Sequence, residues 1–154
     1  MKPLILIAND DSIYSKGIRV LTEIMSEMGE VVVVAPDTHQ SGMGHAITLG
    51  EPLRVVKTND FGDHIQSYKC SGTPADCVKL AIREMLDRTP DLCVSGINHG
   101  SNASINVIYS GTMSAAIEAG IEGIPAIGFS LLDYSWDANF EASKPIVKKI
   151  TEHV

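Results

Sequence analysis

The chain of 154 residues, 44% hydrophobic and 20% charged, is long enough for one compact domain with a sizeable core and too short for two ordinary domains. Its formal net charge of −7 disfavours long nucleic acid as a partner, because such binding depends on Lys and Arg that neutralise phosphates. No apolar run approaches the roughly 18 residues of a membrane helix, and the first residues do not resemble a signal peptide. We therefore expect residues 1–154 to form a single domain of a cytoplasmic protein with no membrane partner.

Strand-like runs alternate with helix-like segments, which is typical of a parallel sheet with helices on both faces. In chain order the sequence predicts a buried strand at 4–8, a helix over 18–28, a buried strand at 30–35, half-buried β segments at 47–57 and 64–71, a helix from 73 to 85, a strand at 92–95, a helix over 107–121, a strand at 126–129 and a helix over 138–154. The half-buried segments flank a turn-rich stretch and predict an appended β-hairpin. Because the last predicted helix runs to the last residue of the sequence, we expect this chain to be a fragment of a longer protein.

Polar clusters follow three of the predicted strands directly. They are Asn9-Asp10-Asp11-Ser12, the loop with Ser41 and Gly42, and Ser95-Gly96-Ile97-Asn98. The carboxyl ends of parallel strands share one edge of a sheet, so these clusters are expected to converge. Carboxylate, hydroxyl and carboxamide oxygens suit Mg²⁺, Mn²⁺ or Ca²⁺. The alternative is that one aspartate caps the next helix and the other faces water, but the two further oxygen-rich loops favour a metal site.

The stretch Ser110-Gly111-Thr112 opens a predicted helix, where free backbone N–H groups and the helix dipole attract an anion. An ordinary serine N-cap is the commoner explanation of such a turn. His39, His45 and His99 lie in the same loops, and one of them could contact substrate or act as an acid.

Other patterns carry less functional information. Gly42-x-Gly44 lacks the third glycine and the preceding first strand of a dinucleotide-binding motif. The cysteines Cys70, Cys77 and Cys93 form no C-x-x-C pair, which indicates small buried side chains and neither a disulfide framework nor a zinc site.

Taken together, the stretches LILIANDDS, VVVVAPDTHQSGMGHAIT, CSGTPADCVKL, PDLCVSGINHGSN, VIYSGTMSAAIEA and GIPAIGFS resemble the SurE family, the survival protein E nucleotidases, in the family's order and over essentially the whole chain. The resemblance implies a Rossmann-like three-layer α/β fold with a mostly parallel central sheet. It also implies a homodimer or homotetramer that exchanges C-terminal elements, and the C-terminal family segment is absent from this chain.

For function, the resemblance implies a metal-dependent phosphomonoesterase that acts on nucleoside 5′- or 3′-monophosphates and, in some members, on short polyphosphate. One divalent cation, Mg or Mn, with Ca as a substitute in a crystal, is implied for each subunit. The implied metal ligands are Asp10, Asp11, Ser41 and Asn98, with Asp10 and Asp11 also catalytic, and the implied phosphate contacts are Asn98, Ser110, Gly111 and Thr112.

Two alternatives to hydrolysis remain from sequence: a receiver-like Mg-binding phosphoacceptor module and a nucleotide-binding domain without turnover. Within the hydrolase hypothesis, a metal-activated water is the preferred nucleophile, and direct attack by Asp10 is the competing route. Ser12 departs from the glycine that usually follows the aspartates in the family, so the loop is expected to be less permissive or to bring a hydroxyl to the site.

Overall fold

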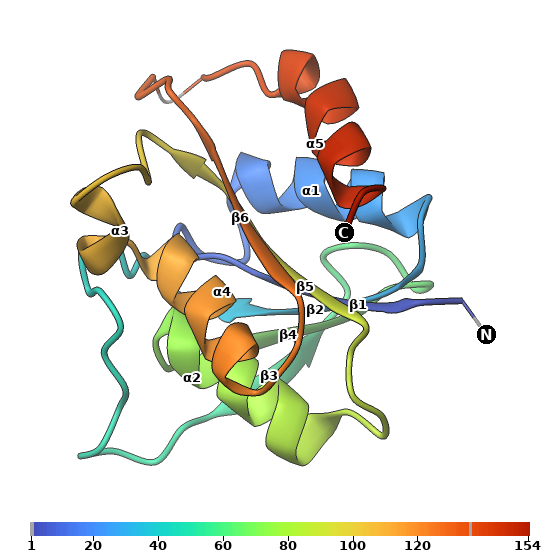
Figure 1. Ribbon diagram of the computed structural model, residues 1–154. Helices are drawn as coiled ribbons and strands as arrows, with labels where there is room; N and C mark the ends of the chain where they lie inside the picture. Colours follow the sequence, from blue (N-terminus) through green and yellow to red (C-terminus); the bar gives the residue numbers. More distant parts are fainter. Residues whose placement is uncertain (1, 136) are drawn as a thin grey trace.

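The computed structural model describes residues 2–135 and 137–154 and shows one six-stranded sheet in the order β3-β4-β2-β1-β5-β6 (Figure 1). All neighbouring strands are parallel except β3 and β4, which are antiparallel. The strands are β1 (Leu4–Ala8), β2 (Glu30–Pro36), β3 (Val55–Thr58), β4 (Gln66–Cys70), β5 (Leu92–His99) and β6 (Ala126–Leu131).

Helices cover both faces of the sheet, which confirms the predicted three-layer α/β fold. The helical segments are α1 (Lys16–Ser26), α2 (Pro74–Leu80), its continuation η1 (Ala81–Met85, a π-helix), α3 (Asn106–Tyr109), α4 (Gly111–Ile121), η2 (Glu141–Ser143) and α5 (Lys144–Thr151). Helices α1 and α5 pack together on one face, and α2 and α4 pack together on the other (Figure 1). No helix within the described residues is long and apolar enough to cross a membrane.

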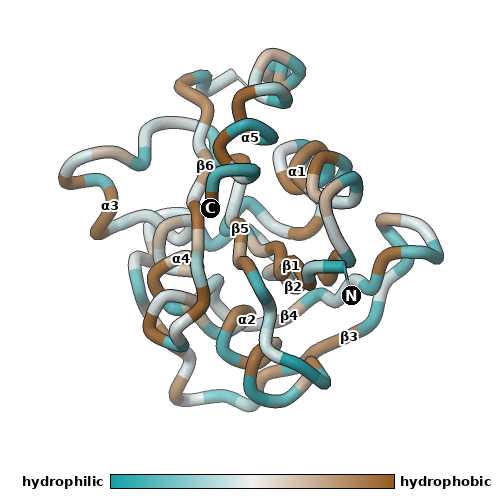
Figure 2. The backbone as a smooth tube through the Cα atoms, turned by 45° about the vertical axis from the view of Figure 1, so that its right-hand side comes forward, coloured by the Kyte–Doolittle hydropathy of each residue, from teal (hydrophilic) through white to brown (hydrophobic). Residues whose placement is uncertain are grey.

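The core consists of two apolar layers, one on each side of the sheet. Alternate residues of β1 point to opposite faces, so Ile5 and Ile7 join the layer under α1 while Leu6 joins the layer under α2 and α4. This two-sided burial explains why β1 and β2 are continuous apolar runs, visible as brown segments in Figure 2. The three cysteines are free and buried, as predicted.

The predicted hairpin exists, but it is shorter than expected and is part of the main sheet. β3 and β4 pair antiparallel, and β4 also pairs in parallel with β2, so β3 is the edge strand. The prediction of a strand over residues 47–54 was wrong. In this segment the backbone N–H and the hydroxyl of Thr48 both donate hydrogen bonds to the carboxylate of Asp76, so they are not available for strand pairing. Pro52 has no N–H to donate to a neighbouring strand.

The predicted helix over 107–121 is divided at Ser110, whose extended backbone separates α3 from α4 and caps α4. β5 runs past the predicted end, so Asn98 and His99 belong to its last residues, after an irregularity in pairing between Ser95 and Asn98. The last predicted helix began too early, because regular helix starts only at η2 and α5. At α2 the structure selects Thr73 as the N-cap and Asp76 as its capping-box partner.

Candidate active site

Asp10 and Asp11 follow β1 and are both buried, at 3% and 8% exposure. The alternative that one aspartate caps α1 while the other faces water does not hold. Ser15 is the N-cap residue of α1, and both carboxylates are buried. Burial raises the pKa of Asp10 above its ordinary value, and the charge of Asp11 adds to the increase, while a hydrogen bond from Thr112 opposes it. Two adjacent, desolvated carboxylates therefore create an environment that a cation would stabilise.

The carboxyl ends of β1, β2 and β5 meet as the sheet order requires, and a cavity of about 320 Å³ opens there. It brings together all four residues that the sequence suggests as metal ligands. Ser41 Oγ lies 3.5 Å from Asp11 Oδ1, within the range of a long hydrogen bond. The cavity is lined by Asp10, Asp11, Ser41, Gly42, Asn98, His99, Ser101, Asn102, Asn106, Tyr109 and Ser110.

Asn102 organises this cavity, and the sequence reasoning did not single it out. Its Oδ1 accepts hydrogen bonds from Asn98 Nδ2 and from Ser110 Oγ, both at 3.0 Å. The first bond fixes the carboxamide of Asn98 so that its Oδ1 is left for another partner. The only sequence signal for this role was a second asparagine four residues after Asn98 in a loop rich in polar residues.

The turn Ser110-Gly111-Thr112 lies against Asp10. Ser110 Oγ accepts from Met113 N at 3.1 Å, so the ordinary N-cap role is present. Thr112 Oγ1 donates to Asp10 Oδ1 at 2.5 Å and is fully buried, so its hydroxyl is committed to that carboxylate. Gly111 permits the contact, because a Cβ at this position would lie 2.6 Å from Asp10 Cβ.

The three histidines of the loops occupy different environments. His39 Nδ1 lies 3.8 Å from Asp11 Oδ1, and His99 lines the cavity and packs edge-on against Phe140. His45 points elsewhere and bonds with Glu118.

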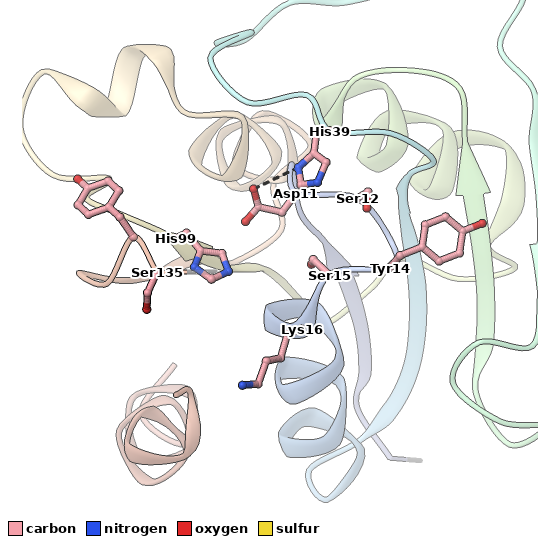
Figure 3. Close-up of a pocket in the computed structure, with 9 residues that line it drawn as sticks. Asp11, Ser12, Tyr14, Ser15, Lys16, His39, His99 and Ser135 are labelled. Carbon is pink, nitrogen blue, oxygen red and sulfur yellow. Dashed lines mark ion pairs between the residues drawn. The ribbon is translucent and has the colours of Figure 1, made fainter. Parts of the chain in front are cut away.

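A second cavity of about 590 Å³ adjoins the first and shares Asp11 and His99 with it (Figure 3). Figure 3 shows His39 beside Asp11, with the ion pair marked, and Lys16 on the first turn of α1. The cavity is lined by Asp11, Ser12, Tyr14, Ser15, Lys16, His39, His99, Tyr134 and Ser135.

Ser12 completes the turn after the aspartates with φ of 80°, in the left-handed region that favours glycine. Its carbonyl accepts from Asn9 Nδ2 at 2.7 Å and from Ser15 N at 3.1 Å, which holds the turn in place. The conformation gives a physical reason for glycine at this position, and Ser12 adopts it at a cost in strain.

Within residues 2–135 and 137–154, no three His, Cys, Asp or Glu side chains gather in the manner of a metal site. A cation at the edge of the sheet would therefore be held by only two carboxylates, Asp10 and Asp11, together with the neutral oxygens of Ser41 and Asn98. Such a mixed oxygen set suits hard cations, which also accept waters in their coordination shell.

Comparison with known proteins agrees with this geometry. Residues 5–154 match the family described as Survival protein SurE. The chain is 65% identical over 153 residues to a 5′-nucleotidase SurE of Flavobacterium psychrophilum, covering 99% of this chain and 60% of that protein. It is 67% identical over 150 residues to a 5′-nucleotidase SurE of Flavobacterium johnsoniae, covering 97% of this chain and 58% of that protein.

A solved structure of a SurE protein from Aquifex aeolicus superimposes with a TM-score of 0.87 at 41% identity, covering 99% of this chain and 60% of the other. The chain thus spans about 60% of the length of the curated relatives that it matches. On the extent of the sequence match and the agreement of the fold, the chain belongs to the SurE family.

Proposed function

We propose that the protein hydrolyses nucleoside 5′-monophosphates to nucleoside and phosphate in a metal-dependent reaction, and that the same site accepts 3′-monophosphates and short polyphosphate. The observation that carries the proposal is the pair of buried carboxylates, Asp10 and Asp11, at a cavity that also receives Ser41 and Asn98. The names of the relatives, 5′-nucleotidase SurE, agree with it.

One divalent cation, Mg²⁺ or Mn²⁺, is the cofactor that this donor set fits. Asp10, Asp11, Ser41 and Asn98 would hold it through oxygen, and because burial raises the pKa of Asp10, a bound cation would stabilise the ionised form of that carboxylate. When bound, the cation would supply Lewis-acid stabilisation of charge on the phosphoryl oxygens.

The phosphate would lie between these ligands and the start of α4. Ser110 and Gly111 begin an 11-residue helix, whose N-terminal backbone N–H groups stabilise an anion. Asn102 holds both Asn98 and Ser110, so it fixes the ligand on β5 relative to the phosphate turn.

The nucleoside would occupy the larger cavity, which begins where the phosphate site ends, at Asp11 and His99. Tyr14 and Tyr134 lie on this cavity with 50% and 77% exposure, and their rings offer apolar faces for a base. A volume of about 590 Å³ is ample for a nucleoside, within the range of small-molecule pockets. Tyr14→Ala should raise KM for the nucleotide more than it lowers kcat.

Water is the nucleophile that we propose. Asp10 Oδ1 already accepts from Thr112, and Oδ2 lies against Gly111, where an added Cβ would be 3.1 Å away. A carboxylate held on both sides has little freedom for in-line attack on phosphorus. Rapid quenching of turnover with labelled substrate should give no acid-stable acyl-phosphate on the protein.

The full-length protein is proposed to be a homodimer or homotetramer. The side chains of Ile105, Ile108 and Tyr109 at α3 are each at least 60% exposed, and neighbouring exposed apolar side chains of this kind suit a contact between subunits. Light scattering on the full-length protein should give a mass of two or four subunits.

The central experiment is phosphate release from a panel of nucleoside monophosphates and polyphosphate, with Mg²⁺, Mn²⁺ or chelator. Wild type should release phosphate only with metal, and Asp10→Asn should abolish release. Asp63→Asn is the matched control, because Asp63 is exposed, lies in the turn between β3 and β4, and does not line the cavities of the candidate site.

Release that persists with chelator, or that survives Asp10→Asn, contradicts the proposal. Stable labelling by a small phosphodonor without phosphate release would instead indicate a receiver-like phosphoacceptor. Nucleotide binding without either reaction would indicate a binding module.

A further inference from the structure

A buried carboxylate lies outside the candidate site but on α4, the helix whose N-terminus forms the candidate phosphate turn. Glu118 in α4 is 3% exposed, and its Oε2 lies 2.8 Å from His45 Nε2 while its Oε1 accepts from Lys79 Nζ at 3.0 Å. Burial works to raise the pKa of Glu118, but the bonds from His45 and Lys79 outweigh it, so the pKa lies below its ordinary value. An ionised, buried carboxylate needs such partners, since it is costly without them.

His45 belongs to the segment of residues 37–54 between β2 and β3, which we call the Ser41 loop because it carries that candidate ligand. The loop has no helix or strand of its own and crosses from the site to the N-terminus of α2. Its other attachments include hydrogen bonds from Gln40 N to Asp10 O (2.8 Å), Gly44 N to Tyr109 O (3.1 Å), Thr73 Oγ1 to Ala46 O (2.7 Å) and Thr48 Oγ1 to Asp76 Oδ2 (2.6 Å), and the two ends of the loop bond to Cys70 and Ser71.

Among these attachments, the contact of His45 with Glu118 is the one that ties the loop by a side chain to the body of α4. Ser41 itself is exposed and only loosely bonded, with 3.5 Å between its Oγ and Asp11 Oδ1. Its position therefore depends on how the loop around it is fastened. His45 is four residues away, and Glu118 is eight residues, or about 12 Å of helix, from Ser110.

We propose that His45 and Glu118 are positioning residues for the active site: together they fasten the Ser41 loop to α4, so that the cation-binding hydroxyl and the phosphate-binding turn at the other end of that helix keep a fixed separation. The inference rests on the proposed function for the identity of the site. Neither side chain lines the site cavity, so neither contacts the cation or the phosphate directly.

The chain offers a matched control for a purely structural role. Arg83 in η1 and Glu122, the C-cap residue of α4, form an ion pair of 2.6 Å, one turn further along from the pair of Lys79 in α2 with Glu118 in α4. Among the described residues, neither side chain of this pair forms a hydrogen bond or ion pair with the Ser41 loop, although Arg83 lines a cavity with Ile47 and Thr48 of that loop. Its loss should change stability without changing the position of Ser41.

The experiment measures Mn²⁺ binding to the full-length protein by calorimetry without nucleotide, together with the free energy of unfolding. His45→Ala should weaken Mn²⁺ binding by about tenfold. Losses of this size are typical when a residue that does not touch the metal, but orients one of its ligands, is removed. His45→Gln keeps a side-chain N–H donor of similar reach and should restore most of the affinity. Glu122→Gln should leave Mn²⁺ affinity unchanged. At saturating Mn²⁺, His45→Ala should recover most of the wild-type kcat.

Equal Mn²⁺ affinity in wild type and His45→Ala overturns the inference and leaves the proposed function intact. So does a loss of affinity in His45→Ala that Glu122→Gln reproduces, because the effect would then follow stability. Absence of Mn²⁺ binding by wild type contradicts the proposed function itself and the inference with it.

Discussion

Gly111 and Gly120 lie in the same helix, and replacing each by alanine should have opposite effects. At Gly111 an added Cβ would lie 2.6 Å from Asp10 Cβ and 3.1 Å from Pro74 Cγ. Asp10 Cβ moves only with its backbone, so the loop after β1 or the start of α4 must shift. Overpacking of this kind costs about 1–3 kcal/mol. At Gly120 nothing lies within 4 Å of an added Cβ.

We expect Gly111→Ala to lower the free energy of unfolding by about 2 kcal/mol, which corresponds to a fall in Tm of about 4–8 °C for a chain of this size. Gly120→Ala should raise it by about 0.5–1 kcal/mol, because alanine replaces glycine in a helix without a clash. Because an error of about 1 Å in a catalytic group can cost about 100-fold in rate, Gly111→Ala should also lose phosphate release.

Thermal and denaturant unfolding of the two variants, with phosphate release measured at saturating metal, test the argument. If Gly111→Ala is as stable as Gly120→Ala and keeps wild-type release, then Gly111 is not required for the approach of α4 to Asp10. The reasoning about the site geometry would then be wrong.

Three further predictions concern residues of the same site. Ser12→Gly should raise the free energy of unfolding by about 0.5–1 kcal/mol in denaturant titration, because glycine adopts φ of 80° without strain; unchanged or lower stability would contradict this. Thr112→Val should lower Mn²⁺ affinity in calorimetry, while Thr112→Ser, which keeps the donor to Asp10, should remain near wild type; equal affinities would refute the orienting role. Metal-free Asp10→Asn should be more stable than wild type at pH 7. Burial raises the folded-state pKa of Asp10, so wild type carries the full penalty above that pKa and loses it as the pH falls from that pKa to the unfolded-state value of about 4, below which the two stabilities should be equal.

The elements with strong periodicity were predictable from sequence. β1 and β2 are apolar on both faces, and the helix around Ile18, Leu21 and Met25 has one continuous apolar side, so local pattern and tertiary burial agree. The convergence of Asp10, Asp11, Ser41 and Asn98 followed from the parallel topology alone, because that topology places strand ends at one edge.

What sequence could not predict depends on contacts between distant segments. Residues 47–54 have strand-like composition, but the carboxylate of Asp76, at the start of α2, captures the groups that Thr48 would give to a ladder. Asn102 is one of several polar residues in its loop, and only the fold shows that Asn98 and Ser110 both donate to it. His45 resembled a site residue by position, yet a helix far along the chain determines its direction.

The hydrogen bond from Thr112 to Asp10 joins residues 102 positions apart. The candidate site is therefore complete only after β5 and α4 have docked on β1, so a growing chain would lack it until most of the sheet is formed. Ligand occupancy is then thermodynamically linked to the whole fold instead of to one loop. A cation at 100 times its dissociation constant would stabilise the folded state by about 2.7 kcal/mol, so the metal-bound protein would resist heat and proteolysis better than the metal-free protein.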